Sequence, residues 1–309
     1  MAVTVGQTKV TSAISVRDMR KTYGDKHAVD GVSFQVAEGE FFGIIGPNGA
    51  GKTTALEIIE GLREADSGEV TVLGERPWPR NPALLPRIGV QLQASSFFER
   101  LTALEQLRTF GALYGVSDKA VHDMLEVVGL TDKAGVQAEK LSGGQAQRLS
   151  IACALIHDPE IVFLDEPTAA LDPQARRNLW DLLRGINDRG KTVVLTTHYM
   201  DEAEALCDRV AVMDTGRILE LGPPADLIRD LNAPVRISVE SAALSEAAAR
   251  SVPGAEQVVG QGLWTEITTS TPGPVLAELA GRGALAGLQV KGATLEDVFL
   301  QLTGREYRA

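Results

Sequence analysis

The sequence is poor in the residues that would place this protein in several common functional classes. It contains 2 cysteines, Cys153 and Cys207. They form neither a CxxC nor a Cys/His spacing, so neither a zinc site nor a disulfide framework is predicted. Lys and Arg number 30 against 41 Asp and Glu, which gives a net charge of -11. Because nonspecific nucleic-acid binding needs concentrated positive charge, no nucleic-acid partner is expected.

Long apolar runs are also missing. No run approaches the roughly 18 residues that mark a membrane span, and residues 1–14 lack the apolar segment of a signal peptide. We therefore expect another subunit to cross any membrane involved, and the absence of a cysteine framework favours a reducing, cytoplasmic setting. At 309 residues, 44% of them hydrophobic, the chain can bury a sizeable core, which favours one large domain and a small one.

The chain from Ile14 to about Pro223 alternates short Val- and Ile-rich runs with longer helical patterns. This alternation predicts an α/β fold with buried strands. The turn-rich stretch "LELGPPADL" then indicates a boundary. We predict a flexible tail at 1–13, a main domain at 14–230 and a small α+β domain at 234–305. The order βαββαβα expected in the small domain resembles a ferredoxin-like split motif with an extra helix.

A glycine-rich motif, "GPNGAGKT" at Gly46–Thr53, follows the apolar run "FFGII" and precedes the helical pattern "TALEIIEGL". It fits G-x-x-x-x-G-K-[ST] in the strand, loop and helix order that a phosphate loop requires. Glycines let successive backbone amides wrap phosphates, Lys52 can reach the β and γ phosphates, and the Thr53 hydroxyl can ligate Mg²⁺. The motif predicts a nucleotide site without identifying the class of enzyme.

A pair of acidic residues follows a second apolar run. The stretch "IVFLDEP" at Ile161–Pro167 reads as a buried strand that ends in Asp165 and Glu166. Asp165 can hold Mg²⁺ through water, while Glu166 faces the γ-phosphate. An Asp-Glu pair after a strand is by itself usually a solvated turn, so this interpretation depends on the glycine motif.

The stretch "LSGGQ" at Leu141–Gln145 places two glycines just before a helical pattern. Glycine lets the backbone approach a ligand closely, and the amides at a helix N-terminus favour an anion. We therefore expect Gly143 and Gly144 to meet a phosphate. A simple break at the start of a helix is the structural alternative.

These three motifs, in this order, resemble those of the nucleotide-binding subunit of ABC transporters, and residues 14–223 fit that pattern. The resemblance implies a P-loop NTPase core with an inserted helical subdomain at about 94–160, which binds ATP with Mg²⁺ and hydrolyses ATP. It implies that Tyr23 stacks on adenine, that Gln93 senses Mg²⁺ and the attacking water, and that His198 contacts the γ-phosphate. Taken singly, Tyr23 reads as a tyrosine beside a turn and His198 as a structural histidine.

The resemblance assigns catalysis, metal binding and nucleotide binding to definite positions. The residues predicted to be catalytic are Lys52, Gln93, Glu166 and His198. Those predicted to bind Mg²⁺ are Thr53, Gln93 and Asp165. Those predicted to bind the nucleotide are Tyr23, Gly46, Pro47, Asn48, Gly49, Ala50, Gly51, Lys52, Thr53, Thr54, Gln93, Ser142, Gly143, Gly144, Gln145, Asp172 and His198.

Partners follow from the same resemblance. Two such subunits close head to tail, so that Ser142 of one meets the γ-phosphate held by the other, and Asp172 in "AALDP" lies in the D-loop between the two sites. Alone, "AALDP" would be a helix-capping turn. We expect a second copy or a homologous ATPase subunit, and a separate polytopic permease that holds the chain at the cytoplasmic face of the membrane. Phe97 and Phe98 lie where this family docks its membrane subunit, although core packing explains them equally well.

The stretches "LTTHYMDEAEALCDRVAVMDTGRI" and "TLEDVFLQLTGRE" look like those of bacterial exporter ATPases for drugs, antibiotics, lipids or polysaccharides. We therefore expect export of a drug-like or lipid-like substrate. One alternative is a soluble ABC-type ATPase that acts on ribosomes or DNA, but such proteins usually carry two ATPase domains or a long coiled coil. A P-loop kinase, the other alternative, would need neither "LSGGQ" nor the histidine.

Overall fold

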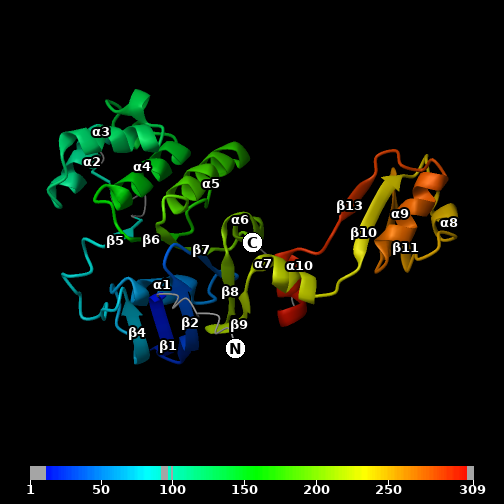
Figure 1. The fold of residues 1–309 in the computed structure, drawn as a ribbon, viewed down its shortest axis with the longest axis horizontal. Coiled ribbons are helices and arrows are strands. Elements are labelled where there is room, and N and C mark those ends of the chain that lie inside the picture. Colours follow the sequence, from blue (N-terminus) through cyan, green and yellow to red (C-terminus); the bar gives the residue numbers. More distant parts are fainter. Residues whose placement is uncertain (1–11, 92–96, 99, 305–309) are drawn as a thin grey trace, which may run out of the picture. The chain divides into compact units, whose positions relative to one another are not determined.

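The computed structural model describes residues 12–91, 97–98 and 100–304 of the chain (Figure 1). The chain forms two compact units, one that ends at Pro224 and one that starts at Ala225. The domain limits predicted from the sequence, 14–230 and 234–305, stay predictions.

A six-stranded sheet forms the centre of the first unit. Its strands, in their order across the sheet, are β5 (Ile88–Val90), β6 (Ile161–Asp165), β7 (Thr192–Thr197), β3 (Phe41–Ile45), β8 (Arg209–Asp214) and β9 (Arg217–Gly222). All neighbours pair in parallel except β8 and β9. Every residue of β3 and β7 is buried, as parallel strands covered on both faces require. The predicted α/β fold with buried strands is confirmed.

A second, antiparallel sheet packs over the first and closes the main core. It consists of β1 (Ser12–Tyr23), β2 (Lys26–Ala37) and β4 (Ser67–Val72), with β1 in the middle. Helix α1 (Lys52–Ile59) contacts strands of both sheets. The stacked rings of Phe34 and Phe42, 5.0 Å apart, belong to this core.

Helices inserted between β5 and β6 form a separate small core, as expected for an inserted helical subdomain. They are α2 (Ala103–Ala112), α3 (Asp118–Val127), η2 (Thr131–Lys133), η3 (Ala138–Lys140) and α4 (Gly143–Leu155). Their buried residues include Leu107, Leu125 and Leu149. Helix α2 begins where the sequence signals it, because Thr102 and Glu105 form a reciprocal capping box. The limits 94–160 stay a prediction.

Two further helices complete the first unit beside the sheet. Helix α5 (Pro173–Asn187) begins with a proline at its first position, behind Asp172 as N-cap. Helix α6 (Met200–Leu206) follows β7 directly and packs against α5. These helices therefore start at the same edge of the sheet at which β6 and β7 end.

The second unit combines an antiparallel sheet with short helices. Its elements are α7 (Pro224–Asp230), β10 (Val235–Glu240), α8 (Glu246–Ala249), β11 (Gln257–Gln261), β12 (Trp264–Thr269), α9 (Pro272–Gly281), β13 (Gln289–Lys291) and α10 (Leu295–Thr303). The strand order is β11-β12-β10-β13. Ile237, Ile267, Val275 and Leu279 lie in its core. Its membership of the ferredoxin-like class stays a prediction.

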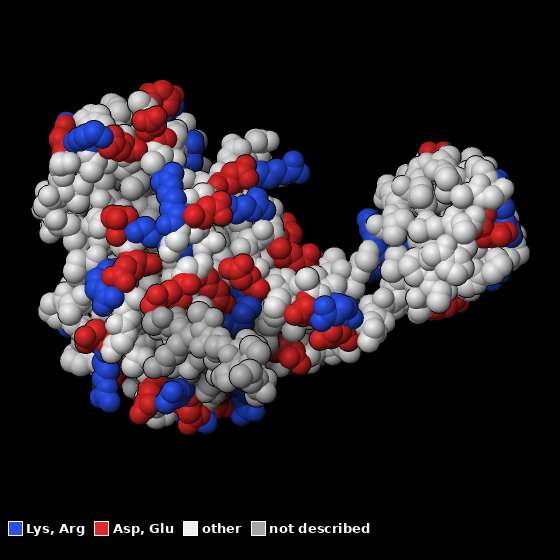
Figure 2. All heavy atoms as spheres, viewed as in Figure 1, with Lys and Arg blue, Asp and Glu red and all other residues white. Residues whose placement is uncertain are grey.

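The surface carries charges of both signs. Lys and Arg are interspersed with Asp and Glu over the face that Figure 2 shows. Within the described residues, none of the helices has the length and hydrophobicity needed to cross a lipid bilayer.

Glu60, at the C-terminal end of α1, is a buried acid. Burial away from water disfavours its charge, and the carboxylates of Asp165 and Glu57 add repulsion, so the pKa of Glu60 rises to about 8. The usual value is 4.5, so between these values the folded chain keeps a proton that the unfolded chain loses. The contribution of Glu60 to the free energy of unfolding therefore falls as the pH rises through this range, because only the unfolded chain ionises this group.

The variant Glu60→Gln removes this ionisable group. We expect its thermal unfolding midpoint, relative to that of wild type, to rise between about pH 5 and about pH 8.5 when nucleotide and divalent ions are absent. Glu64→Gln is the matched control, because Glu64 is exposed on the loop that follows α1. If the difference in unfolding midpoint between Glu60→Gln and wild type stays constant with pH, the pKa of Glu60 is not raised.

Candidate active site

The loop between β3 and α1 depends on glycine for its shape. Gly46, Gly49 and Gly51 all have positive φ angles, of 154°, 82° and 104°. A Cβ atom on Gly46 would lie 2.0 Å from the carbonyl oxygen of Met213, and one on Gly51 would lie 2.0 Å from that of Ala28. Side chains are thus excluded at both places, and the backbone itself lines the loop, as binding of phosphate to backbone amides requires.

Lys52, the first residue of α1, is buried at the base of this loop, with an exposed fraction of 3%. Its Nζ donates to the carbonyl oxygens of Gly46 at 2.9 Å and Pro47 at 3.2 Å. The same atom lies 3.3 Å from Oε1 of Glu166. A buried ammonium needs oxygen partners, and these three hold the positive charge of Lys52 at the loop.

Thr53 and Asp165 form a pair of oxygen groups beside the loop. The Thr53 hydroxyl donates to Oδ1 of Asp165 at 3.2 Å. The hydroxyl of Thr196, at the end of β7, donates to the same oxygen. Hydroxyl and carboxylate oxygens are the protein ligands that suit Mg²⁺, which usually takes one or two of them together with phosphates. The donor groups therefore fit the predicted magnesium ion.

Glu166 adopts an unusual backbone conformation, with φ at 47°. Its backbone N–H donates both to the carbonyl oxygen and to the hydroxyl of Thr196, each at 3.1 Å. Its Oε2 lies 3.0 Å from Nδ1 of His198. The carboxylate is thus held between the Lys52 ammonium and the His198 imidazole. A positive φ outside glycine costs free energy and is found mainly at functional sites.

Lys52, Thr53 and Glu166 border one cavity of about 230 Å³. Its lining residues are Tyr23, Lys26, Ala28, Asn48, Gly49, Gly51, Lys52, Thr53, Thr54 and Glu166. The ring of Tyr23 is 42% exposed, which leaves it accessible for stacking on a base. Arg63 and Lys21 place their charges 5.4 Å and 5.8 Å from its centroid. Predicted residues that are far apart in the sequence are therefore brought together here.

Ser142 and Asp172 lie at a different cavity, of about 200 Å³. Ser142 is the N-cap of α4 and forms a reciprocal capping box with Gln145. Asp172 accepts hydrogen bonds from the backbone of Gln174 and Ala175 at the start of α5. Gly143 and Gly144 line the same cavity, and a Cβ on Gly144 would lie 3.2 Å from Cβ of Ala175. The predicted nucleotide residues thus form two separate groups on one chain.

Gln93, a predicted catalytic and metal-binding residue, lies outside the described residues. Gln91, which directly follows β5, has a buried Oε1 without a hydrogen-bond partner in the described part of the chain. Phe97 packs against the core of the helical subdomain, whereas Phe98 is 56% exposed.

Sequence reasoning missed two residues of the site. Lys26 lines the first cavity with Tyr23, and Thr196 bonds to Asp165 and Glu166. Thr196 could have been found, because it lies near the end of the strand-like run "VVLTT", two positions before His198. Lys26 carries no sequence signal, since a lysine after a turn is usually solvated.

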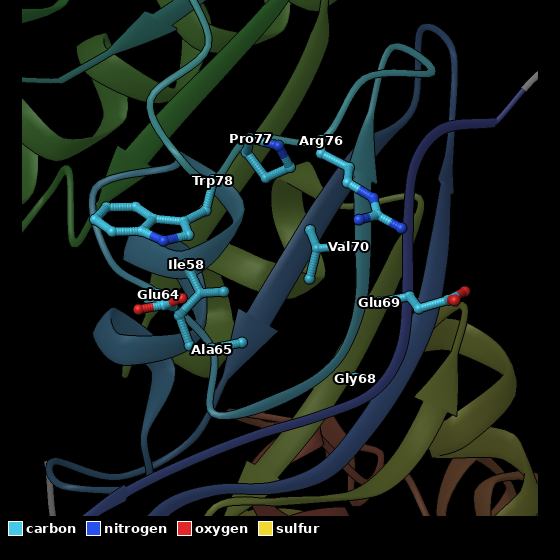
Figure 3. Close-up of a pocket in the computed structure, with 9 residues that line it drawn as sticks. All are labelled: Ile58, Glu64, Ala65, Gly68, Glu69, Val70, Arg76, Pro77 and Trp78. Atoms are coloured by element: carbon cyan, nitrogen blue, oxygen red, sulfur yellow. The ribbon is translucent and has the colours of Figure 1, made fainter.

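Another cavity, of about 310 Å³, contains none of the predicted site residues (Figure 3). Ile58, Ala65 and Val70 provide apolar surface, and the Trp78 ring lies near Glu64 at one end. Glu64, Glu69 and Arg76 are the charged residues of its lining, but the phosphate loop lies at the other cavity, so the chemistry of the protein is assigned to the Lys52 cavity.

Comparison with known proteins agrees with this geometry. Residues 29–169 match the family model described as "ABC transporter". Nod factor export ATP-binding protein I of Sinorhizobium fredii (strain NBRC 101917 / NGR234) is 41% identical over 308 residues, which cover 98% of this chain and 90% of that protein. Its namesake in Cupriavidus metallidurans is 39% identical over 303 residues, 97% of this chain and 100% of that protein.

Solved structures agree as well. An ATP-binding cassette of an ABC transporter in its ADP conformation superposes with a TM-score of 0.64 at 26% identity, over 72% of this chain and 94% of that chain. cbiO1 from Clostridium perfringens, part of the ABC transporter complex cbiONQ, superposes with a TM-score of 0.63 at 28% identity. The superposition covers 72% of this chain and 94% of that chain. Because relatives of about 40% identity align over nearly its whole length, the chain belongs to the ATP-binding subunits of ABC transporters, a family of Mg²⁺-dependent ATPases.

Proposed function

We propose that this chain powers export through a separate membrane-spanning subunit, and that it does so by ATP-driven closure of a dimer of ATPase subunits. The observation that carries this proposal is the division of the predicted nucleotide residues into two groups. Lys52 and Glu166 border one cavity, and Ser142 and Asp172 border another. A nucleotide bound at the first group leaves the second free to contact a nucleotide held by another chain.

Side chains of the first group divide the work of transferring a phosphoryl group to water. The charge of Lys52, fixed at the glycine loop, stabilises negative charge on the β and γ phosphates. Glu166 accepts a proton from the attacking water, and His198 orients that carboxylate through its 3.0 Å contact. Mg²⁺ held by Thr53 and Asp165 neutralises phosphate charge when it is bound.

The ion pair between Lys52 and Glu166 implies that ATP binds before Glu166 can act on water. In the structure the Lys52 ammonium lies 3.3 Å from the Glu166 carboxylate. Phosphate oxygens compete with Glu166 for the ammonium, so binding of ATP releases the carboxylate to act on water. Gln93, which lies outside the described residues, is proposed to sense the metal ion and the attacking water.

Export is supported by relatives that align over nearly the whole chain. Both proteins compared above are named as Nod factor export ATP-binding proteins. We infer export of a drug-like or lipid-like hydrophobic molecule, with this chain at the cytoplasmic face of the membrane, where ATP is available. The permease supplies the substrate pathway.

We assign the permease contact to a mainly apolar cavity of about 320 Å³ between the end of α1, β5, α2 and α4. Leu62 and Phe110 line it, together with Leu113 at the end of α2. Leu113 is 75% exposed and Leu62 is 62% exposed. Exposed apolar surface of this kind marks sites of protein contact.

Replacing Glu166 by Gln tests the proposed base. We expect ATP hydrolysis to fall by at least roughly 100-fold, because general-base catalysis contributes about that much, while ATP binding persists and an ATP-bound dimer accumulates. Phosphate release and size-exclusion chromatography measure the two effects. Glu160→Gln is the control, since Glu160 precedes the same strand but pairs with Arg87. Wild-type hydrolysis by Glu166→Gln would overturn the assignment.

Mixed dimers test whether each site draws on two chains. A dimer of one Lys52→Ala chain and one Ser142→Arg chain keeps one intact site if the sites are shared, whereas a doubly substituted chain paired with wild type keeps none. We therefore expect nucleotide trapping and hydrolysis in the first dimer only. The reverse result would show that Lys52 and Ser142 serve the same nucleotide within one chain.

Co-purification tests the transporter assignment. We expect the tagged chain, extracted from native membranes in mild detergent, to carry one polytopic membrane protein in near-equal amount, identified by mass spectrometry. Leu113→Asp is expected to lose this partner and keep ATP binding, while Leu263→Asp, at a position 81% exposed in the second unit, keeps both. Recovery of ribosomal or DNA-bound complexes instead would replace the transport proposal.

A further inference from the structure

The imidazole of His198 is held on one side by Glu166 and on another by an aromatic ring. The Tyr199 ring centroid lies 4.1 Å from that of His198, with an interplanar angle of 40°. The backbone N–H of Tyr199 donates to the Thr197 hydroxyl at 2.9 Å, which fixes the chain at this point. Contact with this second ring restricts the orientation of the imidazole.

Tyr199 is in turn covered by a cation from another helix. The guanidinium of Arg176 lies 4.0 Å from the Tyr199 ring centroid, within the range of a cation–π contact. Arg176 also approaches Asp201 on α6, with 3.6 Å between Nη1 and Oδ2. Its side chain is 21% exposed, so water screens this stack less than it screens a surface pair. Arg176, Tyr199 and His198 therefore form one continuous stack.

The stack starts close to a residue proposed to lie between the two nucleotide sites. Asp172 is the N-cap of α5, and the backbone N–H of Arg176 donates to its carbonyl oxygen at 2.9 Å. Arg176 is thus fixed to the first turn of α5. Further along this helix, the Trp180 indole donates to the buried Glu202 of α6 at 3.1 Å. The start of α5 and the start of α6 are therefore firmly joined.

We propose that Tyr199 and Arg176 are positioning residues, which hold the His198 imidazole against Glu166 and tie its orientation to the N-terminus of α5. This inference rests on the proposed role of His198 in hydrolysis. Its consequence is that a shift of the segment around Asp172 moves the stack, and with it the hydrogen bond that orients Glu166. Neither Tyr199 nor Arg176 touches the nucleotide in this scheme.

Steady-state and single-turnover hydrolysis of ATP by the full-length chain test the proposal. We expect Tyr199→Leu and Arg176→Leu to lower kcat by roughly 5- to 30-fold, as loss of a desolvated cation–π contact of about 1–2 kcal/mol implies. KM for ATP should stay within about twofold of wild type, because only orientation at the reacting end changes. Tyr199→Phe keeps the ring and should restore most of kcat.

Arg184→Leu is the matched control for Arg176→Leu. Arg184 lies on the same helix and also joins it to α6, by donating to the carbonyl oxygen of Ala205 at 3.0 Å. It lies outside the stack, so kcat should stay unchanged. An equal loss of kcat in Arg184→Leu would show that α5–α6 packing in general matters, and would overturn the specific role of the stack.

A double-mutant cycle separates positioning from general damage to the fold. If Tyr199 acts through His198, Tyr199→Leu should lower the single-turnover rate in wild type and not in a His198→Ala background. Equal losses in both backgrounds would overturn the inference. A fully active Tyr199→Leu beside an impaired His198→Ala would overturn the inference alone. A fully active His198→Ala would overturn the proposed role of His198 as well.

Discussion

Burial of the Lys52 ammonium is the constraint on which the site depends. A charge with an exposed fraction of 3% is stable only among oxygen atoms, and it finds them in the glycine loop and in Glu166. The loop follows β3, Glu166 follows β6 and His198 follows β7, which lies between β3 and β6 in the sheet. Because the carboxyl ends of parallel strands share one edge, strand order alone brings these groups together.

Two capped helix starts define the other half of the site. Ser142 at α4 and Asp172 at α5 satisfy their own backbone amides with side-chain oxygens, so each segment has a defined shape before any partner arrives. The cavity between them is lined by exposed polar groups and glycines, separate from the Lys52 cavity. In the proposed dimer, each chain brings this segment to the nucleotide that the other chain holds.

The second unit distinguishes this chain from the solved cassettes. Those cassettes cover 72% of the chain, whereas the Nod factor export relatives align over 98% and 97% and so include the second unit. Its sheet has its own apolar core around Ile237 and Ile267. The chain therefore shares this unit with the export relatives that align over it.

The sequence by itself determined the features that local backbone chemistry controls. Gly46 and Gly51 are dictated by positive φ angles and close carbonyl oxygens, and the buried runs of β3 and β6 followed from composition. Glu166 could be predicted to lie near the glycine loop, because the order of the motifs along the chain places both at strand ends. The prediction for Gln93 remains open, since it lies outside the described residues.

Only the tertiary structure decided which distant side chains meet. The contacts of Thr196 with Asp165 and of Arg176 with Tyr199 join segments whose spacing in the sequence carries no periodic signal. The raised pKa of Glu60 likewise depends on burial and on an approaching carboxylate. The physical reason is that sequence patterns report conformation over one or two turns of chain, whereas side-chain contacts depend on strand order and helix packing.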